Sequence, residues 1–88
     1  MLVNLYAIYD VCSGIYDGPF PGVADGAVLR DFTDMCKKKD SKMGTHPEDF
    51  TLFKVGTWND GTGEVVDLLT EKLMNGIEAV STSGELDA

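Results

Sequence analysis

The sequence contains no long apolar run. None of its hydrophobic stretches approaches the roughly 18 residues that span a bilayer, and the N-terminal segment lacks the basic start and continuous apolar core of a signal peptide. From these absences we expect a soluble protein, without a membrane partner, that stays in the compartment where it is made.

Residues that commonly bind metals or act as nucleophiles are also scarce. The single histidine, His46, precedes Pro47 in an expected loop, and Cys12 and Cys36 lack the close spacing of structural zinc sites. Cys36 falls on the apolar side of an expected helix, which favours a small buried side chain over a disulfide. We therefore expect no metal site, no cofactor and no catalytic residue, and the protein is not expected to be an enzyme.

Basic residues are fewer than acidic ones, and most of them lie close together in the sequence. Fifteen Asp and Glu against seven Lys and Arg give a net charge of −8, which disfavours tight, sequence-independent binding to nucleic acid. Four lysines within six residues, interrupted by Asp40, nevertheless form a local excess of basic charge. Two interpretations stay open: the lysines complement the negative end of a helix dipole, or they form a nucleic-acid surface together with an arginine, comprising Arg30, Lys37, Lys38, Lys39 and Lys42.

The composition is that of a folded chain. Hydrophobic residues make up 43% and charged residues 25%, values that indicate a globular protein and not a disordered one. A chain of 88 residues forms one core. We expect a single domain over residues 1–80 and a flexible acidic tail over residues 81–88, with oligomerisation as a possible source of added stability.

Hydrophobic periodicity predicts a mixed α and β protein. Apolar residues at every second position from Val3 to Val11 indicate a strand with one buried face, followed by a loose hairpin whose second arm is irregular. An apolar stripe predicts a helix from about Asp25, as its N-cap, to Lys38. The rest is predicted as a strand over residues 50–59, a turn over 60–63, a return strand over 64–68, helical turns over 69–74 and a short strand over 77–80.

This order predicts an α+β fold, in which a mostly antiparallel sheet of about four to five strands carries one long helix on one face. The other face then holds large apolar side chains, which predict a protein interface or self-association: Tyr6, Ile8, Phe50, Leu52 and Trp58. The alternative is that residues 19–23 and the last strand cover this face. The eight aromatic residues could also stack on single-stranded DNA if two or three were exposed beside lysines, although most should be core.

Several segments together resemble a known family. They are the first strand with Leu5-Tyr6-Ala7-Ile8-Tyr9-Asp10, the Pro19-Phe20 pair, the helix with Ala27-Val28-Leu29-Arg30-Asp31-Phe32, and the strand and turn from Pro47 to Gly63. The combination is similar to the small nonstructural protein, labelled DNA-binding, of gokushoviruses. These are members of the Microviridae, phages with single-stranded DNA genomes. The resemblance covers roughly residues 3–77.

The resemblance implies a non-enzymatic protein of the host bacterial cytoplasm. Its implied role is to regulate viral genome replication, the switch to single-stranded DNA synthesis or packaging, by binding DNA or replication proteins. Implied partners are single-stranded viral DNA, the viral replication initiator or the procapsid. The alternative is a homo-oligomeric interaction or assembly module without nucleic-acid contact. The family offers no catalytic motif that can be transferred to this sequence.

Overall fold

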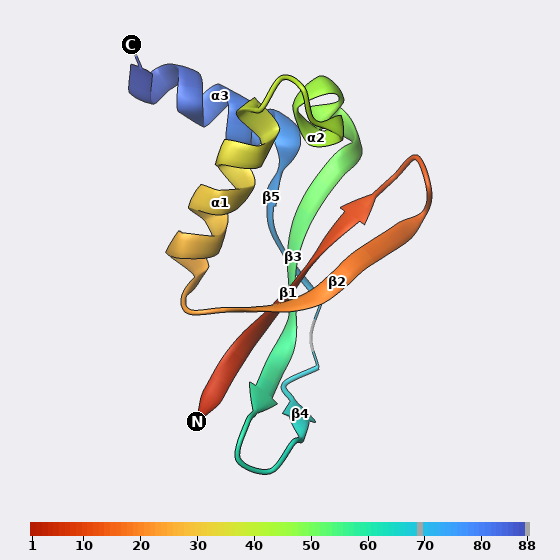
Figure 1. The fold of residues 1–88 in the computed structure, drawn as a ribbon, viewed down its shortest axis with the longest axis vertical. Helices are drawn as coiled ribbons and strands as arrows, with labels where there is room; N and C mark the ends of the chain where they lie inside the picture. Colours follow the sequence, from red (N-terminus) through yellow and green to blue (C-terminus); the bar gives the residue numbers. More distant parts are fainter. Residues whose placement is uncertain (69, 88) are drawn as a thin grey trace.

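A computed structural model describes residues 1–68 and 70–87, with side chains described up to Ser81. Its elements are strands β1 (Leu2–Asp10) and β2 (Ile15–Gly22), helices α1 (Asp25–Lys37) and α2 (Lys42–Thr45), the 3-10 helix η1 (Pro47–Asp49), strands β3 (Phe50–Asn59), β4 (Val65–Val66) and β5 (Glu71–Asn75), and helix α3 (Gly76–Asp87). Figure 1 shows a curled sheet with α1 and α2 on one side of it.

The sheet is antiparallel and follows the order β2-β1-β3-β4, with β5 also pairing with β3. This arrangement confirms the predicted α+β class and the antiparallel sheet of four to five strands. The predicted strand over residues 50–59 and the turn after it are also confirmed: β3 has those bounds, and the Asn59 amide donates to the Glu64 carbonyl at 2.8 Å across the hairpin loop.

A bulge in β3 decides which side chains share a face. Leu5 pairs with Gly56 but Tyr6 pairs with Lys54, so Val55 is an extra residue on β3. Because side chains alternate along a strand, one inserted residue moves all later ones to the opposite face. Trp58 therefore lies on the face opposite the one that Leu52 occupies, although the two have the same parity in the sequence.

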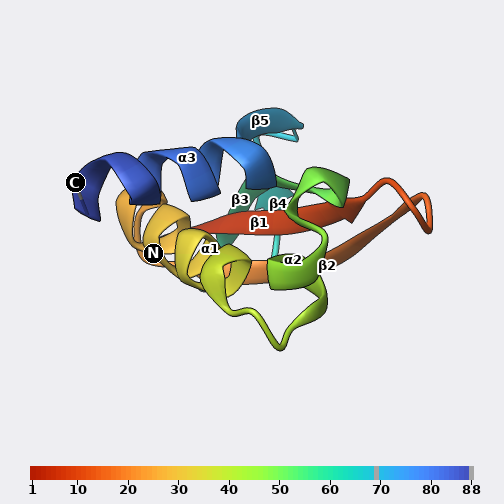
Figure 2. The ribbon, with the colours of Figure 1, turned by 90° about the horizontal axis from the view of Figure 1, so that it is seen from above.

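The core lies on the face of the sheet that α1 covers. It consists of buried residues from the sheet and from helices α1, α2 and α3: Tyr6, Val28, Phe32, Cys36, Met43, Phe50, Leu52 and Ala79. Helix α1 agrees with the predicted helix to within one residue. The prediction of a single helix was incomplete, since α3 lies beside α1 (Figure 2).

The prediction of an apolar interface on the uncovered face of the sheet is wrong for most of its residues. Tyr6 and Leu52 are fully buried and Phe50 is nearly so, which means that they form the core under α1 and not an uncovered face. Ile8 is half-buried and packs against the same cluster. Of the five, only Trp58 lies on the open face, where 37% of it is exposed. The prediction placed the even-numbered residues of β1 on the uncovered face, whereas they lie on the face that α1 covers.

The C-terminal part also differs from the prediction. Residues predicted as helical turns include strand β5, and residues 77–80, predicted as a strand, begin helix α3. The reason is a capping box: the Asn75 side chain accepts a bond from the Glu78 amide at 2.7 Å, and the Glu78 carboxylate accepts one from the Asn75 amide at 3.1 Å. Asn75 thus starts a helix instead of ending one. The backbone is helical to Asp87, and the flexibility of residues 81–88 stays a prediction.

The N-terminus of α1 is fixed to the sheet by Asp25. This residue is not the N-cap, as predicted; Ala24 takes that position without a side-chain cap. The Asp25 carboxylate instead accepts a hydrogen bond from the Tyr6 hydroxyl at 2.5 Å and lies 3.8 Å from the Lys54 ammonium. Burial, and next the bond to Asp25, raise the pKa of Tyr6, so the phenol keeps its proton.

Gly22 gives a direct test of how closely α1 approaches β2. A Cβ at Gly22 would overlap Val28 and come within 2.7 Å of the Tyr6 ring, whereas a Cβ at Gly26 would meet nothing within 4 Å. We expect Gly22→Ala to lower the free energy of unfolding by about 1–3 kcal/mol because it overpacks the core. The matched control Gly26→Ala, inside α1, should be neutral or more stable by up to about 1 kcal/mol. Urea unfolding measures both, and an unchanged midpoint for Gly22→Ala would contradict this packing.

Candidate functional site

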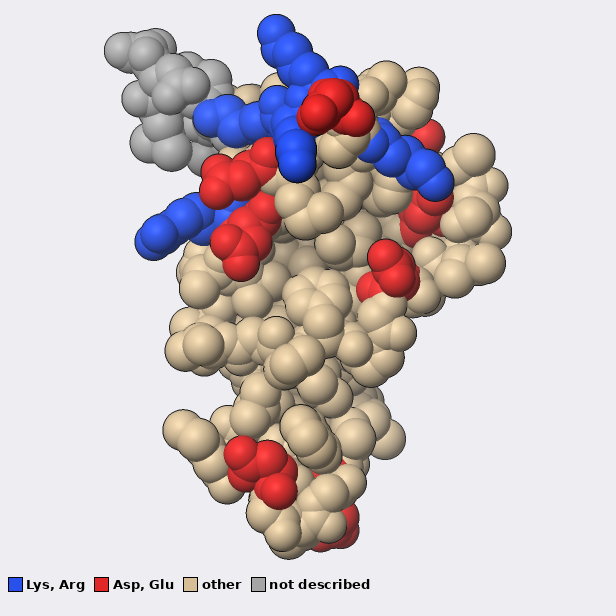
Figure 3. Space-filling model, in the orientation of Figure 1, with Lys and Arg blue, Asp and Glu red and all other residues tan. Residues whose placement is uncertain are grey.

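The lysine end of the molecule comprises Lys37, Lys38, Lys39 and Lys42, at the C-terminus of α1 and the start of α2. All four are exposed. The turn that carries them is well bonded, because the Ser41 hydroxyl donates to the Lys38 carbonyl at 2.7 Å and accepts from the Gly44 amide at 3.0 Å. Figure 3 shows basic side chains gathered at this end and pointing outward in several directions. The structure therefore brings the four lysines together.

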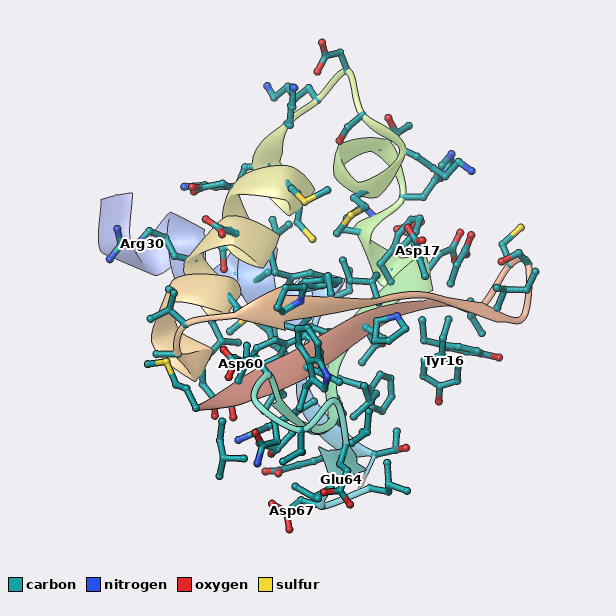
Figure 4. The ribbon with its side chains drawn as sticks, turned by 60° about the horizontal axis from the view of Figure 1, so that its bottom comes forward. Tyr16, Asp17, Arg30, Asp60, Glu64 and Asp67 are labelled. Carbon is teal, nitrogen blue, oxygen red and sulfur yellow. The ribbon has the colours of Figure 1, made fainter. Side chains whose placement is uncertain are left out.

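Arg30 stands apart from the lysine end. It lies on the same side of α1 as Lys37 but two turns earlier, about 10 Å along the axis. Asp34 comes between them, four residues after Arg30 and three before Lys37, which interrupts the positive charge. In Figure 4 the Arg30 side chain points away from the sheet near α3. The predicted basic set therefore divides into four clustered lysines and one separate arginine.

The face of the sheet opposite α1 carries an aromatic cluster that the sequence analysis did not identify. The rings of Tyr9 and Tyr16 are 4.6 Å apart, and Tyr16 meets the edge of Phe53 at 5.4 Å. Trp58 lies on the same face, paired across the strands with Val3 and Val65. We call this surface, with Tyr9, Tyr16, Phe53, Trp58 and Val65, the open sheet face.

Acidic side chains lie at one end of the open sheet face, and Lys72 of β5 lies across from Phe53 on the face itself. Figure 4 shows Tyr16 and Asp17 projecting to opposite sides of β2, and Asp60, Glu64 and Asp67 gathered around the β3–β4 hairpin at one end of the sheet. An aromatic surface that stacks on nucleic acid needs cations beside the rings to hold the phosphates. The lysine end lies at the other end of β3 from this hairpin, so the structure does not bring these two features together.

The histidine and the two cysteines lie in separate parts of the fold. The His46 ring lies 3.8 Å from the Glu48 carboxylate in an exposed loop, and Cys12 is exposed in the β1–β2 turn. Cys36 is in the core, where burial raises the pKa of its thiol to about 11. Among the side chains of residues 1–68 and 70–81, no group of three or more from His, Cys, Asp or Glu could hold a metal ion. The expectation that the protein is not an enzyme stays a prediction.

In the part of the chain that the structure describes, no helix is long and apolar enough to cross a bilayer.

The fold and these surfaces define a small α+β protein with a basic end and an aromatic sheet face. The chain belongs to the Phage ORF5 protein family, whose model matches residues 3–79. The matched range includes α1, α2, the strands β2 to β5 and all of β1 except Leu2. No curated protein and no solved structure matches the chain. The expected resemblance to a phage protein is thus confirmed at the level of this family.

Proposed function

We propose that the chain is a non-enzymatic gokushovirus protein that regulates replication of the viral genome, the switch to single-stranded DNA synthesis or packaging. It works in the host cytoplasm by binding single-stranded DNA, the replication initiator or the procapsid. Membership of the Phage ORF5 family supports the phage origin. The observation that carries the binding proposal is the separation of charge, with four lysines at one end of a chain that is strongly acidic elsewhere.

The lysine end sets the strength expected for DNA binding. Four lysines can neutralise at most about four phosphates, and each releases about 0.7 of a counterion from a single strand. Four contacts give a slope of about −3 for the logarithm of affinity against the logarithm of salt concentration. The remaining negative charge repels DNA from other surfaces. Binding is therefore weak, confined to one end and highly sensitive to salt.

Fluorescence anisotropy with a labelled 20-nucleotide single strand tests this proposal. We expect binding at 25 mM NaCl that weakens by roughly 100-fold at 150 mM. Lys38→Gln/Lys39→Gln should lower the affinity at 25 mM about tenfold or more, because two phosphate contacts are lost. The control Arg30→Gln/Lys72→Gln removes the same charge outside the lysine end and should change it less than threefold. No binding at tens of micromolar, or equal losses in both variants, would contradict a DNA site at the lysine end.

Self-association through the open sheet face is the second candidate. Tyr16, Trp58 and Val65 are 47%, 37% and 46% exposed, and they lie on one surface with partly exposed Tyr9 and Phe53. Contiguous aromatic and aliphatic exposure of this kind marks interaction surfaces. A second copy would cover it without requiring any nucleic acid. Since two copies with net charge −8 repel each other, salt should strengthen this association, the opposite of its effect on DNA binding.

Sedimentation equilibrium at 10–200 µM protein tests the second candidate. We expect the mass to rise above the 9.5 kDa of one chain towards twice that value, and to do so at lower protein concentration in high salt. Tyr16→Ser should shift the midpoint of association to at least fivefold higher concentration. Its neighbour Ile15 is also exposed but points to the other face, so Ile15→Ser is the matched control and should leave the midpoint unchanged. A monomeric mass throughout would exclude this candidate.

A further inference from the structure

A groove lies between α1 and β2, on the face of the sheet opposite the open sheet face. It has a volume of about 540 Å³. Ile8 and Leu52, which pair across β1 and β3, form its floor together with Phe20. Val28 and Met35 of α1 line one wall. The groove exists because α1 packs over the middle strands and leaves the inner face of β2 partly uncovered, so most of its lining is apolar.

The groove continues towards α2. A second hollow of about 390 Å³ shares Ile8, Asp17 and Met35 with the first and extends to Met43 and Phe50. The two together form one trough that runs along α1 from the β2–α1 connection to α2. Met35 stands where the two hollows meet and is 45% exposed. A methionine at this position suits a binding surface, because its flexible thioether adapts to the shape of a bound side chain.

Acidic side chains flank this trough. Asp17 lines it from β2 and Asp31 lines it from α1, and neither carboxylate has a hydrogen bond or ion pair with any residue that the structure describes. In Figure 3 the middle of this face is uncharged and acidic side chains lie on both sides of it, with basic side chains next to them towards the lysine end. Asp10 adds a third carboxylate at the far end, where Lys42 also reaches the lining. Two unpaired carboxylates beside an apolar trough favour an occupant with basic groups next to apolar ones.

We propose that the trough between α1 and β2 binds a basic amphipathic helix of a partner protein. Apolar side chains spaced three and four residues apart on that helix would enter the two hollows, and its flanking Lys or Arg would pair with Asp17 and Asp31. Nucleic acid does not fit here, because the flanking carboxylates repel phosphates. The trough borders the other two surfaces, because Lys42 of the lysine end and Tyr16 of the open sheet face both reach the lining of its second hollow. A partner helix in the trough goes beyond the function proposed above.

A designed peptide tests the trough. The probe is a labelled 16-residue helix with leucines at positions three and four apart and lysines elsewhere, titrated with the full chain by fluorescence anisotropy at 50 mM NaCl. We expect a Kd of tens of micromolar. Asp17→Asn/Asp31→Asn should weaken binding at least fivefold. The control Asp34→Asn/Asp60→Asn removes the same charge away from the trough and should change the Kd less than twofold.

Further controls separate shape from charge. A scrambled peptide of identical composition loses the apolar stripe and should bind at least tenfold more weakly than the amphipathic one. Met35→Gln should also weaken binding, and circular dichroism checks that this variant stays folded. Equal binding of the scrambled peptide, equal losses in the two Asp variants, or no binding at 500 µM would each overturn the proposal. Self-association that Met35→Gln abolishes would also overturn it, because a second copy would then occupy the trough.

Discussion

The hydrogen bond from Tyr6 to Asp25 joins the start of α1 to the covered face of the sheet. The Tyr6 ring is fully buried, and its hydroxyl donates to Asp25 at 2.5 Å while accepting from Asn4 at 3.2 Å. A buried phenol without a partner would cost about 1–3 kcal/mol, so this bond holds the start of α1 against β1. Lys54 adds a partner to Asp25 from β3. The rest of α1 then packs Phe32 onto the sheet.

This attachment produces three distinct surfaces. Placing α1 over β1 and β3 leaves the opposite side of the sheet uncovered, with Tyr16 and its neighbours exposed, and leaves the inner face of β2 open as a trough. The C-terminus of α1 carries Lys37, Lys38 and Lys39 at one end of the molecule, where the basic side chains gather (Figure 3). Lys42, in α2, reaches the end of the trough. Under our proposals the same small domain could contact DNA at one end and proteins elsewhere.

The sequence predicted the fold better than the surfaces. The bounds of β3 and α1 follow from strong periodicity and were predicted to within one residue. The sequence did not predict which side chains lie on which face of the sheet. Both the odd and the even positions of β1 are apolar, and the bulge at Val55 leaves no signal in the sequence pattern. One signal was present and missed: Asn75 followed three residues later by Glu78 is a helix start. The clustering of the lysines followed from their sequence spacing, whereas the trough depends on tertiary packing.

A double-mutant cycle on Tyr6 and Asp25 tests the central claim most directly. The free energy of unfolding would be measured by urea denaturation for the wild type, Tyr6→Phe, Asp25→Ala and the double variant. The cycle isolates the energy that the two side chains share. The account predicts a coupling of about 1–2 kcal/mol, as expected for a partly buried hydrogen bond to a charged group. A coupling near zero would contradict it, since α1 would then be held to the sheet by other contacts.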